Sequence, residues 1–304
     1  MEAKQRQTAV EESLRPLGIL LVAAIALGLT GCASKPKQDE LRVSDLFVLT
    51  QGIQSFQAAE KTDFDSEDEN AIGREAAARI LATRRVHHND TATDYLNLLG
   101  YALSLYSDRP ETFGGYHFLI LDSDEVNGYA CPGGIILVCR GLLRCAGSED
   151  QVAAILSQLI SHIVLKDGLE ALKQFRKARA LSSLALAVAK TEKSSGDDAS
   201  LQTFAQNKDL IAKIEISHYS REATFEADKM STVIMRRIGY NPGALVDLLT
   251  TMKSRMDPML KPNPTADERI SALEKVLAGQ PEVAPNPEAV RARQERFIDA
   301  LGKI

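Results

Sequence analysis

Residues 148–163 are the segment that most constrains the fold of this chain. Ser148 is a favourable N-cap, and Gln151 three residues later predicts a capping box. Gln158 and His162 stand four residues apart, so they share one face of the predicted helix. The apolar positions recur at helical spacing and are Val152, Ile155, Leu156, Leu159 and Ile163. The segment therefore predicts an amphipathic helix with one buried stripe and a short polar pair.

The spacing of that polar pair is the spacing of two zinc-binding histidines. In the motif H-E-x-x-H, histidines at i and i+4 bind zinc from one helical face, and the Glu between them activates a zinc-bound water. The corresponding run here is Gln158-Leu159-Ile160-Ser161-His162. It keeps the second histidine and lacks both the first histidine and the glutamate. The helix resembles the active-site helix of a zinc peptidase with most of the chemistry removed.

The rest of the chain predicts an α+β, mostly helical domain around this helix. Strands are expected at 116–121 and 135–140, with a tight turn at Cys131-Pro132-Gly133-Gly134. The helix at 148–163 is expected to continue past Gly168 to about Lys190. Further helices are expected at 72–81, 94–106, 201–238, from Pro242 to about Met256, at 266–278 and at 287–302.

Several motifs in a fixed order make the chain similar to the HtpX and CAAX-prenyl-protease family of zinc metalloendopeptidases. The similarity covers roughly residues 65–275 and is closest to the soluble lipoprotein and periplasmic members. The motifs are Ile72-Gly73-Arg74-Glu75, residues 127–134, Gly141-Leu142-Leu143, Glu149-Asp150, Ser220-Arg221 with Glu226-Ala227-Asp228, and Gly239-Tyr240-Asn241-Pro242. The resemblance implies a gluzincin-like zincin domain at 61–258, with a small sheet beside the degenerate active-site helix, and a C-terminal helical extension at 259–304.

The resemblance also implies which positions held the chemistry. His162 stands at the second zinc histidine, Gln158 at the first, and Leu159 at the general-base glutamate. Thr224 stands at the third ligand, a glutamate in the family. Asp228, a helper group near the site in the family, is kept. With one ligand of three and no base, the positions predict neither a bound cofactor nor catalysis, and zinc is expected only if the chain is an active enzyme after all.

Simpler roles are available to the same side chains. Gln158 and His162 could hydrogen-bond each other or Asp228. Thr224 can donate to a carbonyl of its own turn, and Leu159 is expected to pack where a polar cavity once lay. The acidic run 63–69 is expected to be a solvated face or a helix lead-in.

A peptide-binding edge could persist without the zinc. By resemblance, the strand at Asn127, Gly128, Tyr129 and Ala130 is the edge that pairs with an extended substrate. Strand addition at such an edge relies on backbone hydrogen bonds and needs no metal.

The N-terminus predicts export and a lipid anchor. The apolar run 17–29 has the size of a signal-peptide core and is too short to cross a bilayer comfortably. It ends in Leu29-Thr30-Gly31-Cys32, which resembles a bacterial lipobox. The prediction is a signal peptide at 1–31 and a lipidated Cys32 with its tether at 32–60, at the outer membrane facing the periplasm. The alternative is a secretory signal with a chance cysteine, and mixed charges before Arg15 leave the translation start open.

Charge and cysteine content limit the partners and the covalent links. The formal net charge is −5 and no basic block is present, which argues against nucleic acid as a partner. Once Cys32 carries lipid, Cys131, Cys139 and Cys145 remain. An exported protein could pair two of them, and the sequence does not say which.

Two main functions follow from this reading. The favoured one is a non-catalytic, peptidase-like envelope lipoprotein that acts as a binding, chaperone-type or regulatory module for envelope proteins or peptides. The alternative is an active zinc endopeptidase in envelope protein quality control. A third class is a subunit that regulates an active peptidase paralogue. Zinc content and a protease assay separate the first two.

Overall fold

Three short strands form one mixed sheet in the part of the chain that the structure describes. The computed structural model describes residues 63–191, 219–255, 264–280 and 286–304. The strands are β1 (His117–Leu121), β2 (Gly128–Cys131) and β3 (Ile135–Cys139), in the order β1-β3-β2. β1 runs parallel to β3 and β2 runs antiparallel to it. The α+β, mostly helical class expected from the sequence is confirmed.

Helices surround this sheet in the described residues. The element η1 (Pro132–Gly134) is the tight turn expected between β2 and β3. The helices are α3 (Ser66–Leu81), α4 (Asp90–Leu105), α5 (Arg140–Leu143), α6 (Glu149–Val164), α7 (Asp167–Thr191), α9 (Arg221–Ile238), α10 (Ala244–Arg255), α11 (Ala266–Ala278) and α12 (Pro287–Leu301). α4 begins earlier than expected because the Asn89 side chain accepts a hydrogen bond from the Ala92 N–H and caps it.

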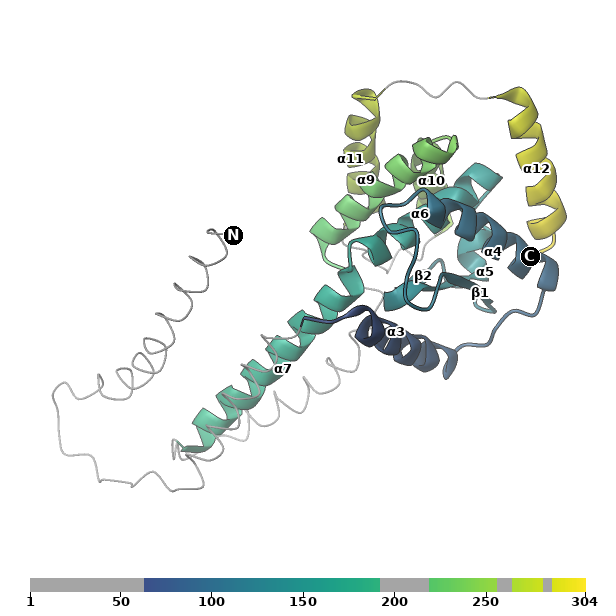
Figure 1. Cartoon of the computed structure of the whole chain (residues 1–304). Helices are drawn as coiled ribbons and strands as arrows, with labels where there is room; N and C mark the ends of the chain where they lie inside the picture. The colour runs from purple at the N-terminus through teal and green to yellow at the C-terminus, as the bar shows by residue number, and fades with distance from the viewer. Residues whose placement is uncertain (1–62, 192–218, 256–263, 281–285) are drawn as a thin grey trace, which may run out of the picture. The chain divides into compact units, whose positions relative to one another are not determined.

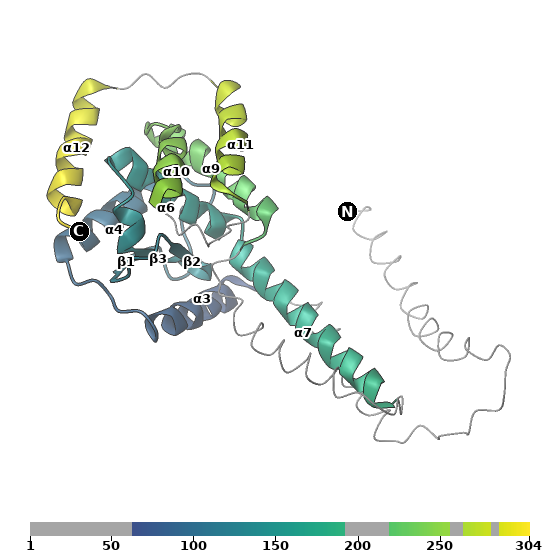
Figure 2. The same ribbon diagram turned by 180° about the vertical axis from the view of Figure 1, so that it is seen from behind.

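The two faces of the sheet bury different helices. Alternate side chains of a strand point to opposite faces. Phe118, Ile120, Ile136 and Val138 join the larger core with α4 and α6. The intervening positions Leu121, Tyr129, Cys131, Leu137 and Cys139 join a smaller core with α3. Figures 1 and 2 show α3 on one side of the sheet and α4 and α6 on the other.

The helix predicted from 148 to about 190 is two helices, so the single-helix prediction was wrong. α6 ends at Val164, and Lys166 has φ 59°, a conformation that L residues seldom adopt. α7 then leaves at 51° to α6. The pattern of apolar residues runs on across the break, which is why periodicity alone did not detect it. Among the described helices, none is by itself long and apolar enough to cross a membrane, and only α6 with residues 167–178 meets that test as a bent pair.

The predicted helix 201–238 also needs correction. Residues 201–218 lie outside the described residues, and α9 begins only after Ser220, whose side chain accepts from the Ala223 N–H. Gly239 ends the helix with φ 83°. Pro242 was expected in the first turn of the next helix, but α10 begins at Ala244.

The capping box predicted at the start of α6 is only half formed. The Ser148 hydroxyl accepts from the Gln151 N–H at 3.4 Å. The Gln151 side chain, however, accepts from the Gly147 N–H at 2.7 Å and not from Ser148. The reciprocal bond of the box is therefore replaced by a bond to the preceding residue.

The acidic run 63–69 leads into α3, which is one of the two expectations: Asp65 caps the helix, and Glu67, Asp68 and Glu69 lie in its first turn. Glu69, however, is not part of a solvated face. Its side chain is buried, and Arg109 donates to its two oxygens at 2.7 and 2.9 Å. The Gly133 N–H also donates to Glu69, at 3.1 Å. Gly133 has φ 77°, which favours glycine. Glu69 therefore fastens the turn between β2 and β3 to α3.

The cysteines that the sequence left unassigned are free and buried at Cys131, Cys139 and Cys145. Burial raises the pKa of the Cys131 thiol to about 12 and that of Cys139 to about 11. Neither is a reactive thiolate near neutral pH. The predicted signal peptide, lipid site at Cys32 and tether lie outside the described residues.

Candidate functional site

His162 is the centre of a hydrogen-bond network that links α6 to the start of α7. Its Nε2 atom lies 2.8 Å from Nε2 of Gln158, and its Nδ1 atom lies 2.7 Å from Oδ2 of Asp167. The Gln158 amide nitrogen is only a donor, so His162 Nε2 must accept. Nδ1 then carries the proton and donates to Asp167. The predicted bond between Gln158 and His162 is present, and the break after α6 is what brings Asp167 to the ring.

This network uses both ring nitrogens. A zinc-binding histidine offers the lone pair of one nitrogen while the other donates to a carboxylate or carbonyl. His162 keeps the second of these bonds, through Asp167. Its lone pair, however, accepts from Gln158, one turn earlier on α6. The imidazole is 3 % exposed, so solvent does not compete for these positions.

Leu159, which the sequence predicted to stand at the family's general-base position, is part of the core. It is buried, as the sequence predicted. A Cβ atom placed on Gly128 would lie 2.9 Å from Leu159 Cδ1, so this side chain packs directly against β2. A leucine side chain can neither accept a proton nor hold a water for attack.

Thr224 and Asp228 on α9 are both committed to structural contacts. The Thr224 hydroxyl donates to the Ser220 carbonyl at 3.1 Å, which is the predicted bond to its own turn. Asp228 is buried, and Arg269 of α11 donates to its two oxygens, both at 2.7 Å. The suggestion that Asp228 binds Gln158 or His162 was therefore wrong: its partner is Arg269.

A second ion pair joins the same two helices. Arg221 at the start of α9 lies 2.9 Å from Glu268 of α11. The Arg221 hydrogen bond, followed by bonds from Thr265, lowers the pKa of Glu268 to about 2. Asp228 thus belongs to a polar seam that docks α11 onto α9.

Replacing Asp228 with alanine is expected to lower the free energy of unfolding by about 3 kcal/mol, because it leaves a largely buried guanidinium without its carboxylate. The measurement is denaturant unfolding of the purified chain. Glu226→Ala on the same helix is the matched control, since that carboxylate is 63 % exposed. Equal midpoints for the two variants would contradict a structural role for Asp228.

The side chains that the sequence predicted to stand at the family's zinc positions do not fit a zinc site. Three protein ligands are needed. Here they are a glutamine amide, a histidine whose lone pair is engaged and a threonine whose hydroxyl bonds its own turn. Within the described residues, no group of three His, Cys, Asp or Glu side chains is arranged to hold a metal ion.

The sheet has one covered edge and one candidate edge. At β1, the Asp122 N–H donates to Arg85 and the His87 N–H to Ile120, both at 2.8 Å, so residues 85–87 close that side. The other outer strand is β2, the strand predicted to receive peptides. In the part of the chain that the structure describes, β2 is therefore the outer strand with no further strand paired to it.

The four predicted edge residues play different parts. The Asn127 side chain accepts from the Gly128 N–H at 2.8 Å. The Tyr129 side chain is buried on the α3 face, with its hydroxyl 3.2 Å from Glu125. Ala130 is buried, and its carbonyl accepts from the Tyr219 hydroxyl at 2.8 Å. Tyr219 was not singled out by the sequence, because no motif spacing points to the residue before Ser220.

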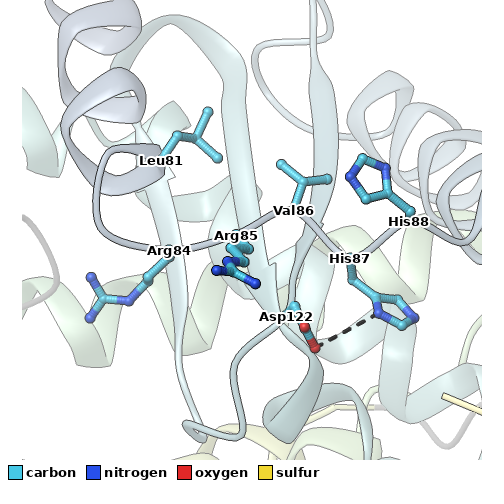
Figure 3. A pocket seen from close by; sticks show the side chains of 7 residues that line it. All are labelled: Leu81, Arg84, Arg85, Val86, His87, His88 and Asp122. Atoms are coloured by element: carbon cyan, nitrogen blue, oxygen red, sulfur yellow. Dashed lines mark ion pairs between the residues drawn. The ribbon is translucent and has the colours of Figure 1, made fainter.

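A cavity of about 620 Å³ lies at the opposite edge of the sheet (Figure 3). Its lining residues are Leu81, Arg84, Arg85, Val86, His87, His88 and Asp122. Asp122 pairs with Arg140 at 2.7 Å and lies 3.9 Å from His87, and Arg84 pairs with Glu125. These charges are largely compensated, and the cavity is separate from the His162 network.

Known proteins resemble this chain over its central part. The sequence profile of peptidase family M48 matches residues 99–277. The β-barrel assembly-enhancing protease of Escherichia coli (strain K12) is 25% identical over 191 residues, or 59% of this chain and 37% of that protein. The protein of the same name from Yersinia pestis is 23% identical, over 67% of this chain and 43% of its own length. The metalloprotease YcaL of E. coli (strain K12) is 23% identical over 86% of this chain and 96% of its own. The chain thus spans less than half the length of the first two relatives.

Proposed function

The chain belongs to peptidase family M48, and from that premise we propose that it is a non-catalytic member that binds segments of other proteins in an extended conformation. The observation that carries the proposal is the hydrogen bond from Gln158 to His162, which takes the lone pair a zinc ion would need. Leu159, packed against Gly128, supports the same conclusion because the water-activating carboxylate is replaced by core packing. On this proposal, structural contacts replace two separate parts of the peptidase machinery.

Peptide binding is the part of the family's activity that these replacements leave possible. β2 is an outer strand, and it packs against α6, where Leu159 lies against Gly128. A bound segment in extended conformation would add to this edge through backbone hydrogen bonds, which require no metal. The Ala130 carbonyl accepts from Tyr219, which lies outside the sheet, so the backbone groups of Ala130 point away from β3. Gly128, two residues earlier in the strand, points the same way.

We place this activity in the bacterial cell envelope, with the chain anchored by a lipid at Cys32. The pattern Leu29-Thr30-Gly31-Cys32 after an apolar run supports the anchor. The name of one relative, a β-barrel assembly-enhancing protease, supports envelope proteins as partners. Regulation of an active peptidase paralogue is compatible with the same binding surface.

The alternative is an active zinc-dependent endopeptidase, as the names of the relatives describe those proteins. The test uses the full chain with Cys32→Ser, so that no lipid is attached. Zinc per chain is measured by elemental analysis, and cleavage of a labelled, unfolded protein is followed with and without chelator. We expect zinc far below one per chain, no cleavage, and binding of the unfolded protein. Near-stoichiometric zinc with chelator-sensitive cleavage would establish the alternative.

The binding site is tested by substitutions at Ala130, whose backbone N–H points away from β3. Ala130→Pro removes this donor while leaving the bonds between β2 and β3 in place, and Ala130→Gly keeps the donor. We expect the proline variant to bind the unfolded protein at least about tenfold more weakly than the glycine variant. Equal binding by both, with equal circular dichroism spectra, would place the binding site elsewhere.

A further inference from the structure

Tyr219 sits between β2 and α6 and contacts the two groups that a bound peptide would meet. Its hydroxyl donates to the Ala130 carbonyl at 2.8 Å. Its ring stacks on the His162 imidazole with 3.9 Å between ring centroids and 22° between planes. Burial raises the pKa of Tyr219 well above its usual value, so the hydroxyl stays protonated and remains a donor.

The Ala130 carbonyl has two lone pairs, so the backbone of an added strand and a ligand hydroxyl can both donate to it. In an antiparallel pair, alternate residues direct both backbone groups to the partner strand and the others direct them away. The Cys139 N–H donates to the Asn127 carbonyl at 3.0 Å, so Asn127, Tyr129 and Cys131 face β3. Ala130 therefore faces away from β3, and Tyr219 occupies its carbonyl.

The position of the Tyr219 ring indicates which ligand side chain the site would favour. An imidazole face next to an acceptor is a complementary surface for one aromatic side chain, because stacked rings gain energy beyond the area they bury. Gln158 and Asp167 hold the His162 ring in one orientation through its two nitrogens. In the network around His162, the former zinc ligand has become one face of an aromatic contact.

We infer that the β2 edge selects extended peptides that carry an aromatic residue, and that Tyr219 occupies this position when no ligand is bound. The inference rests on the proposed peptide-binding function. Tyrosine is expected to be the best side chain, because it can reproduce both contacts of Tyr219. Phenylalanine keeps only the stacking contact, and leucine keeps neither.

The Tyr219 side chain, when it occupies the ligand's position, reduces the apparent affinity of the chain for peptides. Only the fraction of molecules in which Tyr219 has left the position can bind, so the apparent dissociation constant rises by the inverse of that fraction. Removing the Tyr219 ring should therefore tighten binding, whereas most substitutions in a binding site weaken it. This inverse effect distinguishes a competing side chain from one that merely supports the site.

The experiment measures dissociation constants by fluorescence anisotropy for the full chain with Cys32→Ser. The probes are three labelled nine-residue peptides that favour an extended conformation. They have the same sequence except at the central residue, which is Tyr, Phe or Leu. For the chain with Tyr219 intact, we expect affinity to fall in the order Tyr, Phe, Leu peptide. The dissociation constants of the Tyr and Leu peptides should differ about three- to tenfold. Tyr219→Ala should bind the Tyr peptide about tenfold more tightly, and Tyr219→Phe about threefold, because each removes part of the competition. Glu226→Ala on α9 removes an exposed carboxylate, so it is the control and should change nothing.

The possible results separate this inference from the proposed function. If no peptide binds to any variant, peptide binding itself is wrong. If the three peptides bind equally and Tyr219→Ala leaves their affinities unchanged, the edge binds peptides and the aromatic preference is overturned. If Tyr219→Ala is not folded by circular dichroism, Tyr219→Phe and the order of the three peptides decide the question.

Discussion

Replacing Glu149 with alanine should lower the free energy of unfolding by about 3 kcal/mol, the expected cost of removing one partner from a buried polar cluster. Glu149 is 1 % exposed at the start of α6. Tyr240 donates to it at 2.7 Å, Tyr95 at 3.3 Å, and Arg296 of α12 at 2.5 and 3.1 Å. The substitution leaves two enclosed hydroxyls and one guanidinium without their acceptor.

The same change should loosen α12, because Arg296 is the cation that α12 supplies to the cluster. Thermal unfolding should show a midpoint lower by about 6–12 °C for a domain of this size. Hydrogen exchange along α12 should rise more than along α3. Glu75→Ala is the control, since Glu75 is 67 % exposed in a surface pair worth a few tenths of a kcal/mol. A Glu149 variant as stable as this control would show that the cluster does not stabilise the fold.

The double substitution Gln158→His and Thr224→Glu should create zinc binding of about one ion per chain, because three protein ligands suffice for a structural or catalytic site. The first change frees the lone pair of His162 from Gln158, and Asp167 already orients the ring through Nδ1. The second places a carboxylate on α9, which packs along α6. Zinc at a hundred times its dissociation constant should then stabilise the fold by about 2.7 kcal/mol.

The single substitutions are the controls for this prediction. Each leaves fewer than three ligands, so neither should retain zinc after dialysis. The double variant should remain unable to cleave peptides, because Leu159 still fills the base position. Elemental analysis and zinc-dependent thermal shifts, reversed by chelator, measure the outcome. If the double variant binds no zinc, α6 and α9 are not placed as in zinc-binding relatives, and the resemblance at Thr224 is misaligned.

The sequence was sufficient for elements that local patterns specify. The apolar stripe from Val152 to Ile163 predicted α6, and the turn at 131–134 predicted the junction of β2 and β3. The substitutions at Gln158, Leu159 and Thr224 are predictions made from the sequence, because these residues stand within motifs that resemble those of the family. These features depend on residues close together in the chain, where spacing fixes geometry.

The hydrogen-bond partners of the buried polar side chains could not be predicted from local sequence patterns. Asp228 pairs with Arg269, and Glu149 binds Arg296, across separations of 41 and 147 residues. Tyr219 reaches Ala130 across 89 residues. Such contacts depend on how helices cross, which local periodicity does not contain. The break at Lys166 belongs to the same class, since a single unusual φ redirects α7 without interrupting the apolar pattern.

The sequence alone therefore predicted a zinc-peptidase-like scaffold in which the zinc ligands and the base are substituted, and the match to peptidase family M48 supports the scaffold. Only the tertiary structure decided what took their place. It shows that Gln158 and Asp167 hold His162, that Leu159 fills the space beside Gly128, and that Tyr219 covers the Ala130 carbonyl. The physical reason is that residue identity states which donors are lost, whereas the satisfaction of the remaining buried polar groups depends on neighbours brought together by folding.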